Sequence, residues 1–143
     1  MRFSDIQKVT RPVVSTCQHF DCKVKLRYYP AVFTPDFEER VANLVQSVED
    51  DIPQIKTLDK DPADMSDEEI EGLEAIRVPP KRIFNHTVEL LTPLIADWDL
   101  LDDNDKPCPI DQKFMSGVPY PMLYCFMRDI QQDMRPNDTP SSL

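Results

Sequence analysis

Glycine is scarce in this chain: its 143 residues include two glycines against fourteen prolines. Loops that cradle phosphate groups, such as the Walker A and G-x-G-x-x-G loops, need several glycines within a few residues. Two glycines cannot form such a loop, so nucleotide sites of these classes are excluded. The many prolines predict stiff connections between secondary-structure elements.

Long apolar runs are also missing. No window approaches the roughly 18 consecutive apolar residues that cross a bilayer. The N-terminal sequence MRFSDIQKVTRP lacks the apolar core of a signal peptide. We therefore expect a cytosolic protein without a membrane partner.

Catalytic signatures are absent as well. The sequence contains neither G-x-S-x-G nor H-E-x-x-H. Its four cysteines and two histidines show no local pattern that supports a Cys–His catalytic pair. We expect a protein that is not an enzyme and needs no cofactor.

One spacing resembles a metal site, because Cys17, His19 and Cys22 lie close together in the sequence. Zinc would need a fourth ligand, such as His86 or Cys108, and no second knuckle accompanies the cluster. The simpler interpretation is a hairpin turn that contains these residues by chance, so we expect reduced thiols and no metal. A zinc-dependent interaction module stays open as an alternative.

Acidic side chains dominate the charge, and the net charge is −10. Residues 1–30 carry six basic and two acidic side chains, a net charge of +4. Residues 31–80 carry four basic and fourteen acidic side chains, a net charge of −10, and residues 81–143 carry six basic and ten acidic side chains, a net charge of −4. This balance disfavours a nucleic-acid partner, because the phosphate backbone requires a continuous basic surface. The basic N-terminal region has two candidate roles: contact with an acidic partner or with the chain's own acidic middle.

The length is that of one domain, and a hydrophobic fraction of 41% is sufficient for a globular core. Residues 12–16 and 23–29 have β character, and residues 17–22 connect them. In the second segment one face is basic and the other apolar: Lys23, Lys25 and Arg27 alternate with Val24, Leu26 and Tyr28. We therefore expect a β-hairpin in residues 1–30, whose lysines either keep the strand soluble or meet a partner.

Residues 31–134 are predicted to form a mainly α-helical body of about four helices. Thr34 caps a helix that begins at Pro35 and runs to about residue 51, and Ser66 forms a capping box with Glu69. Apolar stripes predict further helices at about 82–98, kinked or restarted at Pro93, and at 121–134. Residues 50–64 are expected to be an exposed acidic linker and 135–143 a flexible tail. The prediction is a single α+β domain with a small N-terminal β-hairpin packed on the helical body.

The stretch WDLLDDNDKPCPID, residues 98–111, contains five carboxylates behind the single tryptophan. A calcium loop needs oxygen ligands at alternate positions, with glycine at the sixth position and glutamate at the twelfth. The sequence does not meet these requirements whether the loop is taken to begin at Asp99 or at Asp102. Carboxylates in a short polar turn stay solvated and ionised, which disfavours acid–base catalysis. We therefore expect a turn, followed by Asp111 as the cap of a short helical piece at 111–115.

The residues of this stretch resemble a segment of the tail assembly chaperones of long-tailed (siphovirus-type) bacteriophages. In that family a stretch like W-D-L-x-D-x-D-G-x-P-x-P-x-T follows an amphipathic helix and precedes a short helix, a proline and a last amphipathic helix. The matching residues here are Trp98, Asp99, Leu100, Asp102, Asp103, Pro107, Pro109 and Asp111, and upstream Tyr29, Pro30, Thr34, Pro35 and Glu39. The resemblance covers most of residues 20–134. Asp105 stands where the family often has glycine, and Pro93 interrupts a helix that is usually free of proline.

This resemblance implies a non-enzymatic assembly factor in the cytoplasm of the infected host cell. Such chaperones bind the phage tape-measure protein, keep it soluble and help to recruit tail-tube subunits. A structural neck or tail protein that stays in the virion is the alternative, and a homo-oligomer is left open. We expect the partner to bind in grooves between the helix that begins at Arg82 and the last helix. The residues expected to contact it are Trp98, Phe126, Met127 and Ile130.

Overall fold

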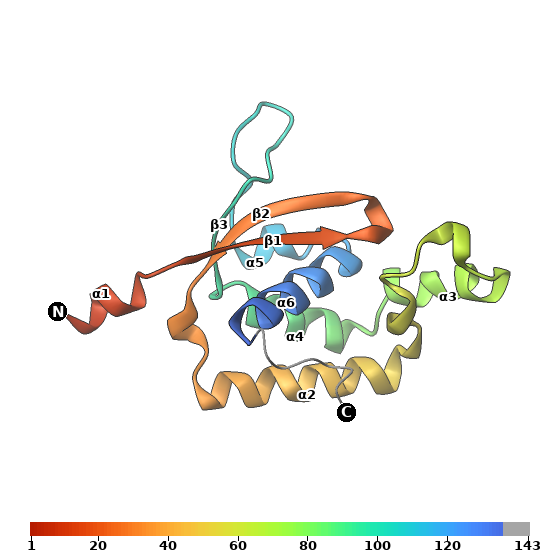
Figure 1. Cartoon of the computed structure of the whole chain (residues 1–143), viewed down its shortest axis with the longest axis horizontal. Helices are drawn as coiled ribbons and strands as arrows, with labels where there is room; N and C mark the ends of the chain where they lie inside the picture. Colours follow the sequence, from red (N-terminus) through yellow and green to blue (C-terminus); the bar gives the residue numbers. More distant parts are fainter. Residues whose placement is uncertain (136–143) are drawn as a thin grey trace.

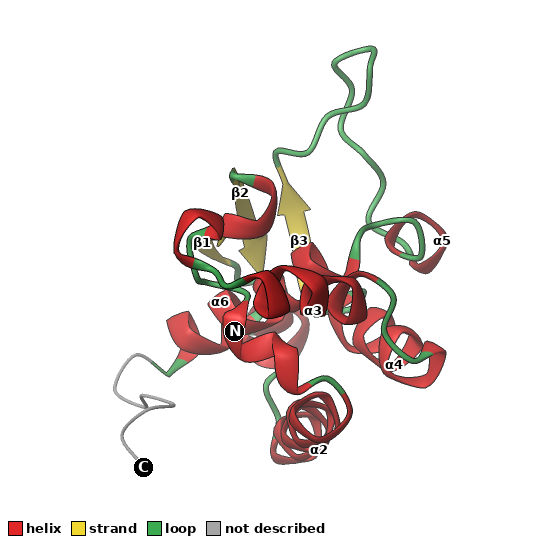
Figure 2. Ribbon diagram, turned by 90° about the vertical axis from the view of Figure 1, so that its right-hand side faces the viewer, coloured by secondary structure: helices red, strands yellow, loops and turns green. Residues whose placement is uncertain are grey.

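A computed structural model describes residues 1–135 and contains a three-stranded antiparallel sheet packed on helices. The α+β fold expected from the sequence is therefore confirmed. The helices are α1 (Phe3–Gln7), α2 (Pro35–Asp51), α3 (Asp67–Arg77), α4 (Lys81–Leu91), α5 (Gln112–Met115) and α6 (Tyr120–Met134). The strands, in sheet order, are β1 (Arg11–Cys17), β2 (Cys22–Tyr28) and β3 (Ile95–Trp98). Figure 1 shows α6, α4 and α2 beneath the sheet, and Figure 2 shows the same layers from the side.

Strands β1 and β2 form the predicted hairpin, with Cys17 opposite Cys22 at its closed end. The chain reverses through a 3₁₀ turn, Gln18–Phe20, and through Asp21, whose φ of 47° is left-handed. The alternation predicted for β2 is confirmed, because its basic side chains are exposed and its apolar side chains are buried. β2 is nevertheless the central strand of the sheet, since β3 pairs with its other edge.

The helix predicted at 82–98 is wrong beyond Leu91, where α4 ends. Pro93 has no N–H, and in a helix its ring would clash with the carbonyl four residues earlier. The Oγ1 hydroxyl of Thr92 donates to the carbonyl of Val88 at 2.8 Å and closes the last turn. The chain then forms neither a kinked helix nor a new one; it becomes β3, antiparallel to β2.

The acidic segment 50–64 is less exposed than expected. α2 continues to Asp51, and two 3₁₀ helices follow, Pro53–Thr57 and Pro62–Asp64. Within this segment Ile52, Ile55 and Leu58 are buried. Their spacing of three matches the three residues per turn of a 3₁₀ helix, so one side of the segment packs into the core. Residues 59–64 are the longest continuously exposed stretch of the segment.

Three predicted helix caps are confirmed. Thr34 and Asp111 each accept the N–H of the residue three positions later, at 3.2 and 2.7 Å. Ser66 and Glu69 form the reciprocal capping box, with both bonds at 3.2 Å. These local bonds fix where α2, α3 and α5 begin.

Both ends of the described chain differ from the predictions. α1 was not expected; it stands apart from the body in Figure 1, and Phe3 on it is 73% exposed. At the other end Arg135 forms an ion pair with Glu38 of α2, so the chain is still attached where the tail was predicted to begin. The rest of that predicted tail, residues 136–143, lies outside the described residues.

Helix α6 is fixed to β1 by polar contacts. The Asp129 Oδ2 atom accepts the Ser15 hydroxyl at 2.8 Å and the Thr16 N–H at 3.0 Å. Arg128 donates to the carbonyl of Thr16 at 2.9 Å. Ser15 is buried, so its hydroxyl needs such a partner. These bonds place the end of β1 directly over the helix.

Tyr28 makes a second contact between the sheet and α6. Its side chain is fully buried, and its hydroxyl donates to Asp133 Oδ2 at 2.7 Å. Burial, together with the neighbouring Asp133 carboxylate, raises the pKa of Tyr28 to about 12. The neutral phenol is therefore the form that the fold accommodates.

Candidate partner-binding surface

The four side chains predicted to contact a partner all lie in the core. Trp98 is 5% exposed, Phe126 1%, Met127 3% and Ile130 0%. The rings of Trp98 and Phe126 lie 6.1 Å apart between centroids, and Trp98 Nε1 donates to the carbonyl of Cys108 at 2.9 Å. These contacts join β3 to α6 and present no surface to a partner. Their partner-binding role stays a prediction, and it requires the core to open.

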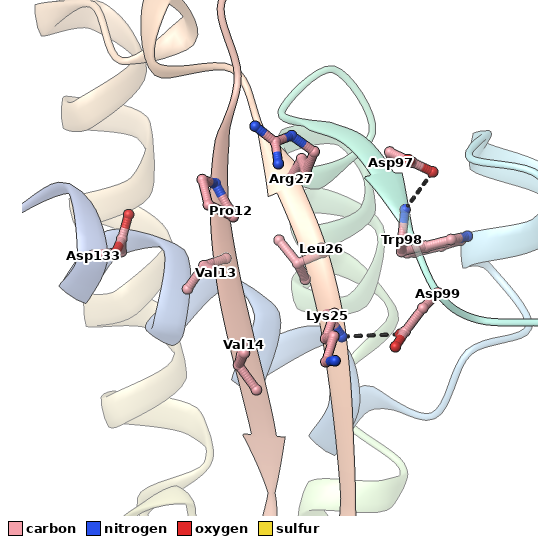
Figure 3. A pocket seen from close by; sticks show the side chains of 10 residues that line it. All are labelled: Pro12, Val13, Val14, Lys25, Leu26, Arg27, Asp97, Trp98, Asp99 and Asp133. Carbon is pink, nitrogen blue, oxygen red and sulfur yellow. Dashed lines mark hydrogen bonds between the residues drawn. The ribbon is translucent and has the colours of Figure 1, made fainter.

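The outer face of the sheet, turned away from α6, offers an accessible surface instead. It carries a groove of about 650 Å³, whose lining side chains are drawn in Figure 3. Val14, one of the lining residues on the edge strand β1, is 51% exposed. We call this surface the open sheet face, and it consists of Pro12 and Val14 of β1, Lys23, Lys25 and Arg27 of β2, and Asp97 of β3.

Charges of both signs line the groove, with Lys25 and Arg27 beside Asp97, Asp99 and Asp133. No ion pair between described residues involves a basic side chain of β2. The nearby carboxylates are engaged: Asp97 accepts the N–H of the next residue and Asp99 accepts the N–H of Lys25, both at 2.9 Å (Figure 3). Arg27 Nε donates to the hydroxyl of Thr10 at 2.9 Å, so the exposed ammonium groups of Lys23 and Lys25 are the basic groups of β2 most accessible to a partner.

The free edge of β1 offers little backbone to a partner strand. Antiparallel pairing directs the N–H and C=O groups of residues 12, 14 and 16 away from β2. Those of Thr16 are already bonded to Asp129 and Arg128. Pro12 has no N–H. The outward groups that remain for a partner strand are the carbonyl of Pro12 and the N–H and carbonyl of Val14.

Residues 99–110 form a projection that we call the finger, and Figures 1 and 2 show it extending from the end of β3 away from the body. Its two arms are paired: the N–H of Asp102 donates to the carbonyl of Lys106 at 2.8 Å, and the N–H of Cys108 donates to the carbonyl of Leu100 at 2.9 Å. Leu101 is 54% exposed on one arm. The Trp98–Cys108 bond described above fixes the base of the finger.

The tip of the finger is the turn expected from the sequence. Asp102 Oδ1 accepts the N–H groups of Asn104 and Lys106 at 2.8 and 3.1 Å, which closes the turn. Asp105 has a φ of 60°, in the left-handed region that glycine favours. This carboxylate cluster therefore serves chain reversal, and its side chains are exposed.

The zinc alternative is not supported. Residues 1–135 contain no group of three or more side chains arranged to hold a metal, so Cys17, His19 and Cys22 do not converge on one point. His19 Nε2 instead accepts a bond from Arg77 Nε at 3.0 Å. The neighbouring thiol of buried Cys125, and then the backbone of the hairpin turn at Phe20 and His19, lower the pKa of Cys17 against the effect of burial.

The sequence predicted the basic stripe of the open sheet face but missed the residues beside it. Val14 is adjacent to Val13 in an apolar pair, and strand alternation alone shows that the two face opposite sides. Asp97 was assigned to a helix, although Pro93 was a signal that the helix ends early. A two-residue period identifies Val14, but it would place Asp97 on the side of buried Ile95, because the register shift beside Arg27 interrupts the alternation of β3.

No described helix is both long enough and apolar enough to cross a membrane. Comparisons with models of protein families, with curated proteins and with solved structures found no match to this chain.

Proposed function

We propose that this protein is a tail assembly chaperone of a long-tailed bacteriophage. It binds the tape-measure protein in the host cytoplasm, keeps it soluble and helps to recruit tail-tube subunits. The proposal starts from the resemblance of residues 98–111 to the corresponding segment of that family. The open groove on the sheet supplies a surface for such binding.

The observation that carries the proposal is the backbone of Asp105. The family often has glycine at this position, and glycine is favoured where φ is positive. Asp105 has a φ of 60°, and within residues 1–135 the only other positive φ of a non-glycine residue is that of Asp21. The backbone conformation thus supports the alignment at a position of the turn where the residue type departs from the family.

The open sheet face is the surface that we assign to the tape-measure protein. Its exposed Val14 supplies an apolar contact, and the basic side chains of β2 supply charges that select an acidic flank. The net charge of −10 keeps the chaperone and its cargo soluble. Tape-measure segments with aliphatic residues beside acidic residues should therefore bind best.

Co-expression with a tiled set of segments of the cognate tape-measure protein tests the proposal. At least one segment should move from the insoluble to the soluble fraction and should copurify with the chaperone. The variant Val14→Glu should lose this effect. The variant Val78→Glu, at another exposed valine, is the matched control and should retain it. Failure of every segment to gain solubility would overturn the proposal.

Mass spectrometry of purified virions separates this function from a structural role in the particle. A chaperone acts during assembly and should be absent from mature virions. Detection at a fixed copy number would instead identify a neck or tail component.

A further inference from the structure

Residues 1–9, which we call the arm, carry apolar side chains that the rest of the chain does not cover. All nine residues are exposed, and the large apolar side chains among them are Met1, Phe3, Ile6 and Val9. The arm approaches the 3₁₀ turn Pro30–Val32 of its own chain without burying any of its residues. A helix as short as α1 is marginal without packing. The apolar side chains of the arm therefore mark a contact with another molecule.

Basic charge accompanies these apolar side chains. Arg2 and Lys8 are exposed, and neither forms an ion pair in the part of the chain that the structure describes. The one carboxylate of the arm, that of Asp5, accepts the N–H of Arg2 at 3.1 Å. Such an arm fits a surface on which an exposed apolar side chain is surrounded by carboxylates.

Helix α3 carries such a surface on its outer side. Ile70 is 48% exposed, and the exposed residues Asp67, Glu71 and Glu74 lie three or four positions from it, on the same side of the helix. We call these four residues the acidic helix face. The opposite side of α3 is buried in the core. The acidic helix face is thus presented to solvent by a helix that the fold holds in place.

Basic side chains near α3 leave this charge uncompensated. Lys60 pairs with Glu69, on another side of the helix, at 2.8 Å. Arg77, at the end of the helix, donates from Nε to His19 Nε2 at 3.0 Å. The acidic middle of the chain, residues 31–80 with a net charge of −10, therefore offers carboxylates to a partner at this helix.

The arm and the acidic helix face lie at opposite ends of the molecule (Figure 1). The arm leads into β1 at Arg11, whereas the bond from Arg77 to His19 places α3 against the closed end of the hairpin. The strand between these points spans about 20 Å. Because the arm extends away from α3 in Figure 1, contact within one chain would require it to reverse and cross the sheet. A second copy presents its α3 without any rearrangement.

We propose that the arm of one copy packs on the acidic helix face of a second copy. Phe3 and Ile6, three positions apart on one side of α1, cover Ile70. Arg2 and Lys8 approach the carboxylates around it. The two surfaces are different, so the contact is heterologous and successive copies join head to tail.

A second copy is the occupant that the charge distribution favours. Residues 1–30 have a net charge of +4 and residues 31–80 a net charge of −10, so the chain contains both of the surfaces that attract each other. The net charge of −10 on the whole chain makes other contacts between copies repulsive. This inference concerns contacts between copies and does not rest on the tape-measure proposal.

Two variants divide the contact into halves. The arm variant, Phe3→Ser with Lys8→Glu, retains an intact acidic helix face. The face variant, Ile70→Ser with Glu74→Lys, retains an intact arm. All four positions are exposed, so both variants should fold, and far-UV circular dichroism checks this.

The matched control is Leu101→Ser with Glu89→Lys. It makes the same two changes as the face variant, at exposed positions of the finger and of α4. It leaves both the arm and the acidic helix face intact, so it should associate as the wild type does.

Sedimentation velocity from about 10 μM to about 1 mM measures the association. The wild type and the control should both exceed the chain mass of 16.6 kDa as concentration rises, and should grow beyond a dimer. Each half variant should associate at least about tenfold more weakly. An equimolar mixture of the two half variants should form a 1:1 dimer and stop there, because it contains one intact arm and one intact acidic helix face.

Three results would overturn the proposal. The first is a wild type that stays monomeric over the whole concentration range. The second is a pair of folded half variants that associate as strongly as the wild type, or a control that is weakened as much as they are. The third is a mixture of the half variants that remains monomeric.

Discussion

Replacing Trp98 with Ala should remove the largest single contribution to the contact between β3 and α6. The side chain is 5% exposed and packs against the rings of Phe114 and Phe126, at centroid distances of 5.8 and 6.1 Å. Truncation of a buried aromatic to Ala costs about 4 kcal/mol. Loss of the bond from Nε1 to the carbonyl of Cys108 adds about 1 kcal/mol. We expect the free energy of unfolding to fall by about 5 kcal/mol, out of roughly 5–15 kcal/mol for a typical domain.

Trp98→Phe separates the two contributions. Phe retains most of the ring packing but has no N–H, so we expect a loss of about 2 kcal/mol, from one hydrogen bond and a smaller buried area. Urea denaturation followed by far-UV circular dichroism measures both variants; tryptophan fluorescence cannot, because Trp98 is the single tryptophan. The melting temperature of Trp98→Ala should fall by about 15 °C. Val78→Ala, at a residue 74% exposed, is the control and should change little.

The reasoning fails if Trp98→Ala lowers the free energy of unfolding by less than about 1 kcal/mol, since a buried indole cannot be removed so cheaply. It also fails if the Phe and Ala variants are equally unstable. That result would mean that the hydrogen bond, and not the ring packing, holds β3 on α6.

Three further predictions concern stability. Asp105→Gly should raise the free energy of unfolding by about 0.5 kcal/mol in urea denaturation, because glycine adopts a positive φ without strain; a decrease would contradict the left-handed turn. Asp129→Ala should lower the free energy of unfolding by about 2 kcal/mol, since it leaves the buried hydroxyl of Ser15 and the N–H of Thr16 without an acceptor, and Ser15→Ala should restore part of the loss in the double variant. The pKa of Tyr28 is raised to about 12, whereas an unfolded tyrosine ionises near pH 10, so its contribution to stability should be complete below about pH 10 and lost as the pH rises toward 12. Denaturation at several alkaline pH values should show a shallower decline for Tyr28→Phe, and an equal decline would contradict the burial of the phenol.

Local signals predicted the parts of the fold that depend on a few neighbouring residues. The caps at Thr34, Ser66 and Asp111 each involve residues three positions apart, so the sequence contains all that determines them. The alternation in β2 is likewise visible in a short window. These elements could be predicted because their stabilising bonds are made within the segment itself.

Strand β3 was missed because its buried residues continue the period of the preceding helix. Val88, Leu91, Ile95 and Trp98 are spaced by three and four residues, as on one face of a helix. In a regular strand Ile95 and Trp98 would face opposite sides. The register shift beside Arg27 places Ile95 opposite Tyr28 and Trp98 opposite Leu26, so both are buried. A long-range irregularity of this kind leaves no trace in the local sequence.

The predicted site residues were chosen because they belong to apolar stripes of predicted helices. Such a stripe indicates that one helix face is buried, but it does not show whether a partner or the protein's own fold buries it. On α6 the cover is the molecule's own sheet, which the sequence did not place over that helix. The open sheet face contains one aliphatic side chain among charged ones, a pattern that single-segment reasoning treats as ordinary solvent exposure. It becomes a candidate surface only after three separate segments are brought together.

The bonds at the edge of β1 decide how any partner can be recognised. A strand that adds to a sheet edge does so mainly through its main chain and tolerates many sequences. Here proline at position 12 and the contacts of Thr16 with α6 leave room for three such bonds at most, at the carbonyl of Pro12 and the N–H and carbonyl of Val14. Recognition must then depend on side chains, which mutation can change one at a time. In the proposed chaperone role, the protein and its tape-measure partner are therefore expected to coevolve closely, and exchange of either one between distant phages should abolish assembly even where the two folds are alike.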